Sequence, residues 1–327
     1  QLKRVFLVFR RQACSEVAAG RSCAMEGSSQ LEQIDAKNCQ ELLDAGGDSE
    51  KRQAYGFECL TSGFANHVWS VASSGGKKRL VVKSYTDLML LRIEAHAVGA
   101  VDELAGRCGV GPVVHLSNQT GLVMDFLPGR TLEEVDVHRG NLAMLEGVAK
   151  MLSKLHSQKV PAACEGEPML WRTMEKMMLV AKQTPELLPA GIPSMEVIDQ
   201  EIAAAKTALE RHRPKIVLGH GDFKPSNVLE HNGEVKLIDF ELGGPNYRGF
   251  DWMKLFRTAG DFSEESMRLF LRAYAESAGE SCSLEDLEAL LQETQVFEPL
   301  TWLEAFVFFL ALPQFKSDEL PRWHKLA

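Results

Sequence analysis

Apolar residues in the first half of the chain gather in short runs that are rich in β-branched side chains and separated by turn residues. The runs 68–71 and 80–83 flank the segment Ser-Ser-Gly-Gly-Lys-Lys, which indicates a β-hairpin. Residues 88–106 then show the spacing of a helix, and the runs 113–116 and 122–126 enclose a polar turn. The pattern therefore predicts the order strand, strand, helix, strand, strand.

Helical periodicity dominates the second half of the chain. Apolar residues fall on one face of segment 142–156, and Asn141 is its expected N-cap. Further helices are predicted over 168–183 and 196–212, and Ser283 begins a Ser-x-x-Asp capping pattern. This half of the chain is therefore predicted to be mainly helical.

One predicted strand pair interrupts these helices. Segments 227–229 and 235–238 flank Asn232-Gly233, a strong two-residue signal for a tight hairpin. Near the end, the apolar run 300–312 carries Glu304 and is too short to span a membrane. We therefore expect that run to form a buried helix, without stable membrane insertion.

Polar residues with a shared chemistry surround the second hairpin. His220-Gly221-Asp222 and Asn227 precede it, and Asp239-Phe240-Glu241 follows it. Phosphoryl transfer asks a protein for positioning and charge neutralisation rather than for covalent chemistry. Asp222 can accept the proton of an attacking hydroxyl, and oxygen atoms of Asn227 and Asp239 suit Mg²⁺. We predict Asp222, Asn227 and Asp239 as catalytic residues, with Asn227 and Asp239 also binding the metal.

The predicted sheet supplies residues suited to a nucleotide. Lys83 ends a strand-like run, where its ammonium can reach phosphates, and Glu94 in the following helix is placed to pair with it. A turn that contains Ser62, Gly63 and Asn66 can offer backbone N–H groups to phosphate oxygens.

The segment Met124-Asp125-Phe126-Leu127 joins the two predicted parts of the chain and can offer backbone groups to an adenine ring. We therefore add Asp125 to the predicted nucleotide-binding residues, which are Ser62, Gly63, Asn66, Lys83, Glu94 and Asp125.

These motifs resemble those of the choline/ethanolamine kinases, within the aminoglycoside phosphotransferase and choline kinase superfamily. The chain has His-Gly-Asp and Asp-Phe-Glu where protein kinases carry His-Arg-Asp and Asp-Phe-Gly, which disfavours a protein kinase. Three further stretches, which begin at Phe126, Thr173 and Asn246, are similar to the same family, and the resemblance covers roughly residues 57–315. It implies ATP as donor, Mg²⁺ as cofactor and a small amino alcohol, choline or ethanolamine, as acceptor.

The resemblance also implies an α+β, two-lobed protein-kinase-like fold, with a small antiparallel β-sheet lobe and a larger, mainly helical lobe. Candidate substrate-binding residues are Glu241, Tyr247, Trp252 and Trp302. The family carries a polar and acidic pattern where this chain has Lys254 and Arg257, and these two cations would repel choline or ethanolamine if they face the pocket. Asp251 either anchors the catalytic loop or caps a helix, and His156 is expected to be packed rather than catalytic.

Charge and cysteine content exclude several classes of protein. The chain has 327 residues, a formal net charge of -9 and a pI of about 5.6, which disfavours a nucleic-acid binder. Its 7 cysteines are odd in number and form no Cys-x-x-Cys pair, which disfavours both a disulfide framework and a zinc site. We therefore expect a cytoplasmic protein, although the basic and apolar segment 2–11 is either a surface-packed extension or the remnant of an organellar targeting peptide.

We predict three parts: a partly irregular extension over 1–50 with a helix near 31–43, a nucleotide-binding small lobe over 51–126, and a catalytic, acceptor-binding helical lobe over 127–327. Two alternatives to choline or ethanolamine kinase stay open at this point. One is a kinase of another hydroxyl compound, such as an aminoglycoside-like compound, homoserine or a sugar. The other is a non-catalytic scaffold, with the extension as the contact of a homodimer or a larger assembly.

Overall fold

Alternating apolar residues build an antiparallel five-stranded sheet with the order β1-β2-β3-β5-β4. The strands are β1 (Tyr55–Ser62), β2 (Asn66–Ser73), β3 (Arg79–Tyr85), β4 (Val114–Asn118) and β5 (Gly121–Asp125). The predicted hairpin is confirmed, since Trp69 of β2 lies opposite Val82 of β3, and β4 and β5 form the predicted second pair. Strand β1 carried too little alternation to be predicted.

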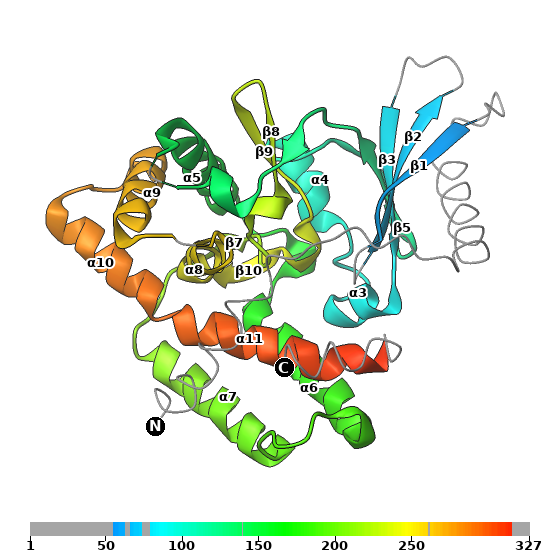
Figure 1. Ribbon diagram of the computed structural model, residues 1–327, viewed down its shortest axis with the longest axis vertical. Coiled ribbons are helices and arrows are strands. Elements are labelled where there is room, and N and C mark those ends of the chain that lie inside the picture. The colour runs from blue at the N-terminus through cyan, green and yellow to red at the C-terminus, as the bar shows by residue number, and fades with distance from the viewer. Residues whose placement is uncertain (1–54, 63–65, 74–78, 139, 261, 316–327) are drawn as a thin grey trace.

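The coordinates are a computed structural model that describes residues 55–62, 66–73, 79–138, 140–260 and 262–315. The predictions made for the segments 1–50, 2–11 and 31–43, and for Gly63, lie outside the described residues. Figure 1 shows the five-stranded sheet at one side of the molecule and most of the helices at the other. The two-lobed, kinase-like arrangement predicted from the sequence is confirmed.

Two short helices replace the single helix predicted over 88–106. They are α3 (Asp87–Arg92) and α4 (Ala100–Arg107). Helix α3 ends because Ile93 adopts an extended backbone conformation, and α4 begins after Gly99, whose φ is +70°. A Cβ atom on Gly99 would lie 1.9 Å from the hydroxyl oxygen of Ser117, so only glycine fits this entry into the helix.

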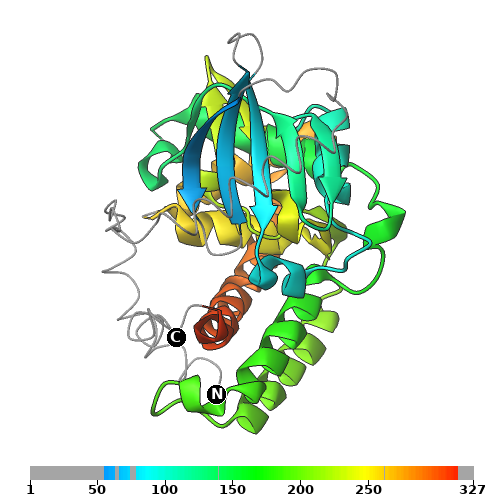
Figure 2. The ribbon, with the colours of Figure 1, turned by 90° about the vertical axis from the view of Figure 1, so that its right-hand side faces the viewer.

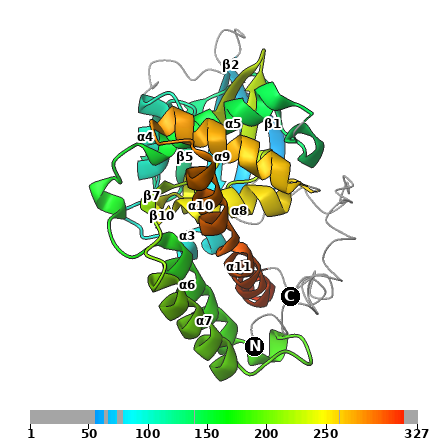
Figure 3. The same ribbon diagram turned by 90° about the vertical axis from the view of Figure 1, so that its left-hand side faces the viewer.

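The remaining helices form the large lobe. They are α5 (Leu142–His156), α6 (Met169–Gln183), α7 (Met195–Glu210), α8 (Arg248–Thr258), α9 (Glu264–Ala278), α10 (Leu284–Gln295) and α11 (Glu298–Ala311). Short 3-10 turns connect them at η1 (Glu134–Asp136), η2 (Ala162–Cys164), η3 (Pro185–Leu187), η4 (Pro225–Asn227), η5 (Phe240–Leu242) and η6 (Leu312–Gln314). Figure 2 looks onto the sheet with α6 and α7 below it, and Figure 3 shows α5, α8, α9 and α10 from the opposite side.

The helices predicted near residues 142, 168 and 196 are confirmed as α5, α6 and α7. Helix α5 buries the whole predicted apolar face. Asn141 is the N-cap residue as predicted, but its side chain makes no capping hydrogen bond and donates to the carbonyl oxygen of Asp136 instead. The Ser283 cap of α10 is confirmed, since its hydroxyl oxygen accepts a hydrogen bond from the backbone N–H of Asp286.

Two small sheets hold the segments between the helices. Strand β7 (Ile216–Gly219) pairs with β10 (Gly244–Tyr247), while β6 (Arg130–Thr131), β8 (Val228–His231) and β9 (Glu234–Leu237) form a three-stranded sheet. The predicted hairpin β8-β9 is confirmed, with Asn232 and Gly233 both at positive φ. These short strands fix both ends of the segments that carry the predicted catalytic motifs.

Segment Leu284–Gln314 is long and apolar enough to cross a membrane by length and composition. In the structure it is divided between α10, α11 and η6, and half of its most apolar window is buried inside the molecule. Helix α11 packs against α6 and α8. These contacts account for its apolar side chains, as predicted from the sequence for a buried helix.

Candidate active site

The loop that follows β7 is held in place by one buried carboxylate. The Asp251 Oδ2 atom accepts a hydrogen bond of 2.7 Å from the backbone N–H of His220, and Oδ1 accepts one of 2.9 Å from that of Gly221. Asp251 Oδ2 also lies 3.0 Å from Nε2 of His156, whose other ring nitrogen is 2.9 Å from the Tyr274 hydroxyl. Asp251 is therefore the anchor of the loop, and His156 is a packed residue, as expected.

The turn at His220-Gly221 depends on backbone conformation and on burial. Gly221 has a φ of +80°, and a Cβ atom there would lie 2.2 Å from the carbonyl oxygen of Leu242. Burial lowers the pKa of His220, so its imidazole is neutral, and its Nε2 atom lies 2.9 Å from the carbonyl oxygen of Ile238. The imidazole therefore links this loop to the segment that leads into Asp239.

Asp222 projects from the loop between two ammonium groups. Its Oδ2 atom is 2.7 Å from Nζ of Lys224, and its Oδ1 atom is 3.3 Å from Nζ of Lys254. Burial by itself would raise the pKa of Asp222, but Lys224 and Lys254 outweigh burial and hold the pKa well below its usual range. Asp222 is therefore an ionised carboxylate that can accept a hydrogen bond from a hydroxyl.

A second cluster of charges joins the two lobes. Lys83 of β3 forms an ion pair with Asp239, and its Nζ atom is 3.6 Å from Oε2 of Glu241. Burial alone would lower the pKa of Lys83, but these carboxylates raise it above its ordinary value. Burial and the nearby Asp239 raise the pKa of Glu241 to about 7. Lys83 thus lies beside the Asp-Phe-Glu motif, where its ammonium can meet phosphate groups held by that motif.

Asp239 adopts an unusual backbone conformation. It is one of three described non-glycine residues with a positive φ, at +71°. Such strain is found most often at functional positions, where the surrounding contacts hold it in place. The turn η5 follows at once and points Glu241 back toward β2, where Asn66 donates a hydrogen bond to its carboxylate.

The predicted ion pair between Lys83 and Glu94 is not formed. The extended backbone at Ile93 turns Glu94 toward α6, where its carboxylate lies 2.7 Å from Lys176 and 3.5 Å from Arg172. The acid of the helical segment that acts on Lys83 is instead Asp102 of α4, which is only 6% exposed.

Asp102 also contacts the motif that carries the predicted metal ligand. Its carboxylate accepts a hydrogen bond from the backbone N–H of Phe240, and burial raises its pKa to about 6 despite the attraction of Lys83. Asp102 therefore connects β3 to the Asp-Phe-Glu motif from the side of α4. Sequence reasoning missed it, although an acid on the apolar face of a short helix is a recognisable signal.

Three of the predicted nucleotide-binding residues, Ser62, Asn66 and Lys83, lie toward one end of the sheet, whereas Asp125 lies at the other end, opposite Leu80 of β3. Asn66 begins β2 and is buried against Glu241, while Asp125 ends β5 and places Oδ1 2.6 Å from Nε2 of His115. Ser62 ends β1, at the turn toward β2. The order in the sheet puts β2 and β5 on either side of β3, so Lys83 has one of these strands on each side.

The predicted metal ligands suit Mg²⁺. Asn227 donates its amide N–H to the carbonyl oxygen of Asp222 at 2.8 Å, which leaves its amide oxygen available to a cation. Asp239 supplies carboxylate oxygens from the opposite segment, and the backbone N–H of Ile238 donates to the carbonyl oxygen of Asn227 at 3.0 Å. Mg²⁺ is usually bound by one or two such oxygens together with substrate phosphates, so the donor set fits the ion.

The comparison with known sequences decides the family. The family model described as Choline/ethanolamine kinase matches residues 57–318. The chain belongs to the choline/ethanolamine kinase family. Ethanolamine kinase 2 of Rattus norvegicus is 27% identical over 202 residues, which cover 58% of this chain and 52% of that protein. The chain therefore spans about half the length of this curated relative.

Solved structures of the same family share the fold. An ethanolamine kinase of Plasmodium vivax superimposes with a TM-score of 0.73 at 19% identity, covering 93% of this chain and 95% of that one. The structure of LicA in complex with AMP gives a TM-score of 0.63 at 17% identity, with 91% and 96% covered. This choline/ethanolamine kinase family member thus has the kinase-like fold that its sequence motifs implied.

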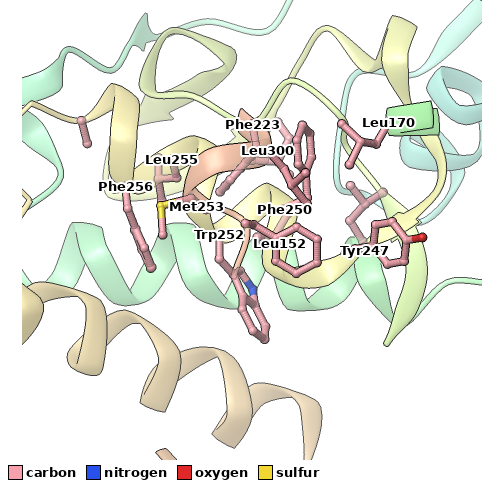
Figure 4. Packing of buried hydrophobic residues seen from close by; sticks show 14 of the residues in the cluster. Leu152, Leu170, Phe223, Tyr247, Phe250, Trp252, Met253, Leu255, Phe256 and Leu300 are labelled. Atoms are coloured by element: carbon pink, nitrogen blue, oxygen red, sulfur yellow. The ribbon is translucent and has the colours of Figure 1, made fainter. Parts of the chain in front are cut away.

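The acceptor side of this family member differs from the prediction at two aromatic residues. Trp252 is fully buried and packs edge-on against Tyr274 with ring centroids 4.9 Å apart, and Figure 4 shows it inside the hydrophobic core. The Tyr247 hydroxyl accepts a hydrogen bond of 3.0 Å from Nε1 of Trp171. Both were expected to bind substrate, but Tyr247 at the end of β10 and Trp252 in α8 belong to the hydrophobic core.

Several charged and aromatic side chains of α3, α8 and α11 lie near Asp222 in this family member. Lys254 and Arg257 of α8 face it, and Trp302 and Glu304 of α11 lie behind them. Arg92 of α3 adds a third cation, with its guanidinium 3.7 Å from Glu241. Sequence reasoning missed Arg92 and Lys224. Arg92 could have been noticed as a charged residue that ends the apolar stretch of α3.

Proposed function

We propose that the chain transfers the γ-phosphoryl group of MgATP to the hydroxyl group of a small molecule. The observation that supports this most is that predicted catalytic and nucleotide-binding residues from distant parts of the chain lie close together. Asp222 and Asn227 come from the loop after β7, and Lys83 and Asp239 form an ion pair across the two lobes. A family kinase needs these four side chains around one phosphate chain.

Each side chain has a task in this reaction. Lys83 binds and orients phosphate oxygens. Asn227 and Asp239 hold the Mg²⁺ ion, which supplies positive charge to the phosphates when bound. Asp222 accepts the proton of the acceptor hydroxyl as that oxygen forms its bond to the γ-phosphorus. The bond from the γ-phosphorus to ADP breaks, so the products are a phosphate ester and ADP.

The electrostatics around Asp222 support its role in orientation. A carboxylate whose pKa lies well below the ordinary value is a weak base, so it mainly fixes the hydroxyl and takes its proton late, once the oxygen bonds to phosphorus. Lys224 and Lys254 keep Asp222 ionised and fix the position of its carboxylate. The negative charge of Asp222 repels an anionic group from its immediate surroundings. A neutral hydroxyl can bind there instead.

Choline and ethanolamine are the first acceptors to test, because the relatives' names point to them. A second candidate is another hydroxyl compound, and one observation favours it. The Lys254 ammonium lies between Asp222, at 3.3 Å, and Glu304, at 2.8 Å. The two carboxylates that could attract a cationic substrate are therefore already paired with a cation of the protein.

The test is ADP release from MgATP with a panel of alcohols, together with equilibrium binding of MgATP. Asp222→Asn should lower kcat by about 10²- to 10⁴-fold, the range of general-base effects, and leave the KM for ATP within a few-fold. Asp199→Asn, an exposed carboxylate on α7, is the matched control and should leave both constants unchanged. A wild-type chain that binds no nucleotide and releases no ADP with any alcohol would instead support the scaffold alternative.

A further inference from the structure

Two cations of α8, Lys254 and Arg257, lie on the same side of Asp222. Lys254 is only 5% exposed, and its Nζ atom is 3.3 Å from Asp222 Oδ1. Arg257 follows three residues later, so both side chains project from the same face of the helix. An alcohol that reaches Asp222 therefore meets positively charged groups at its other end.

Arg257 is the cation of this pair that has unfilled bonding capacity. It forms no ion pair within the part of the chain that the structure describes, and its Nε atom is buried without a hydrogen-bond partner there. Burial lowers its pKa, and the attraction of Glu304 and Asp222 offsets burial only in part. A guanidinium has five N–H donors in a planar fork, and a buried donor left without an acceptor is costly.

Two aromatic rings of α11, those of Trp302 and Phe308, each lie under an arginine of the chain. The guanidinium carbon of Arg257 lies 4.5 Å from the centroid of the Trp302 ring, and that of Arg92 lies 5.6 Å from the centroid of the Phe308 ring. A ring face attracts a cation, and each of these faces already holds one. Trp302, which was predicted as a substrate-binding residue, therefore supports a guanidinium of the chain.

We propose that the acceptor of this chain carries an anionic oxygen group, a carboxylate or a phosphate ester, and that Arg257, backed by Trp302 and flanked by Lys254, binds that group while Asp222 holds the hydroxyl. This inference rests on the proposed kinase function and specifies its substrate class. A carboxylate or phosphate fits the planar fork of Arg257 with two parallel hydrogen bonds. The Asp222 carboxylate is separated from the bound anion by Lys254, which neutralises the repulsion between them.

An acceptor panel with one variable group tests the proposal. Ethanolamine and choline carry a cation, 1-propanol carries no charge, glycolate and glycerate carry a carboxylate, and glycerol phosphate carries a phosphate ester. We expect ADP release to be fastest with an anionic alcohol, and the carboxylate and phosphate arms decide which anion the site prefers. Turnover of ethanolamine or choline in preference to every anionic alcohol overturns the inference and leaves the proposed kinase function intact.

Variants that change the charge or the shape of the Arg257 side chain provide a second test of the proposal. Arg257→Gln should lower kcat/KM for the preferred anionic alcohol about 100-fold, mainly through KM, because a charge-assisted bidentate contact is lost. Arg257→Lys should restore part of that loss, since it keeps the charge without the fork. Arg272→Gln removes an exposed arginine of α9 and should change nothing. Equal constants for Arg257→Gln and the wild type overturn the inference.

Binding without turnover keeps the inference testable if catalysis is slow. Calorimetric titration of the MgADP-loaded chain with glycerate and with ethanolamine compares the two charges directly. We expect glycerate to bind more tightly and its affinity to fall about 100-fold in Arg257→Gln. Tighter binding of ethanolamine, or binding of neither compound, overturns the inference, whereas a failure of MgADP itself to bind overturns the kinase function as well.

Discussion

Replacing Asp102 by asparagine should make the protein more stable at neutral and alkaline pH. Asp102 is 6% exposed, and burial raises its pKa from the ordinary value of 3.8 to about 6 even though Lys83 attracts its charge. An acid whose pKa is raised by folding stabilises the folded state below its unfolded pKa and loses that contribution as the pH rises through the folded pKa. The wild-type protein therefore loses stability between about pH 4 and pH 6.

The size of the effect follows from the pKa. A rise from 3.8 to about 6 means that ionised Asp102 costs the folded protein about 3 kcal/mol at pH 8, and about half of that at pH 5. Asparagine cannot ionise, and its amide oxygen can still accept the hydrogen bond from the backbone N–H of Phe240. Asp102→Asn should therefore raise the free energy of unfolding by up to about 3 kcal/mol at pH 8 and by about half as much at pH 5.

Urea denaturation at pH 5 and at pH 8 measures this difference. Glu103→Gln is the matched control, because the Glu103 carboxylate, on the next residue, is 44% exposed and pairs with Arg107 at 3.6 Å. The control should change the free energy of unfolding by less than about 0.5 kcal/mol at either pH. An Asp102→Asn variant that is less stable than the wild type at pH 8, or equally altered at both pH values, would refute the reasoning.

Three further variants probe other parts of the fold. Asp251→Asn places an amide N–H against the backbone N–H groups of His220 and Gly221, so urea denaturation should show a loss of about 3 kcal/mol or more; a loss below about 1 kcal/mol would mean that the loop has other anchors. Trp252→Phe should lower the melting temperature but leave the KM of the preferred acceptor unchanged, because the indole lies in the core; a raised KM at an unchanged melting temperature would return Trp252 to the substrate site. Gly221→Ala should abolish ADP release while circular dichroism shows an intact helical signal, since the clash with the carbonyl oxygen of Leu242 is local; full activity would contradict that geometry.

Order along the chain made much of the site predictable. The segment between Asp222 and Asp239 forms a hairpin, which the turn signal Asn232-Gly233 predicts. A hairpin reverses the chain, so the motifs that precede and follow it are brought close together. The sequence offered Asp251 as either the anchor of the loop or a helix cap, because it ends the stretch from Asn246 that is similar to the family. Local turn chemistry and motif order are properties of the sequence itself.

The direction in which a side chain points in the fold was not predictable in the same way. Residues 88–106 keep a helical spacing although Ile93 and Gly99 interrupt the helix, so the sequence pointed Glu94 toward Lys83 and the fold points it toward Lys176. Trp252 and Trp302 are both tryptophans close to the motifs. Only packing shows that the first is enclosed, whereas the second is partly exposed and lies against the Arg257 guanidinium.

The anchor of the catalytic loop has a consequence for how the protein is made. Asp251 ties the loop to His156 of α5, and His156 in turn is tied to Tyr274 of α9. A chain that emerges from the ribosome therefore presents the complete His-Gly-Asp motif well before the helix that completes its support. The contact between His156 and Tyr274 forms only when α9 docks, so the support of the loop is incomplete until that helix has been made. Premature termination between Asp251 and Tyr274 should thus yield a chain that contains every predicted catalytic residue but lacks part of the support of their loop.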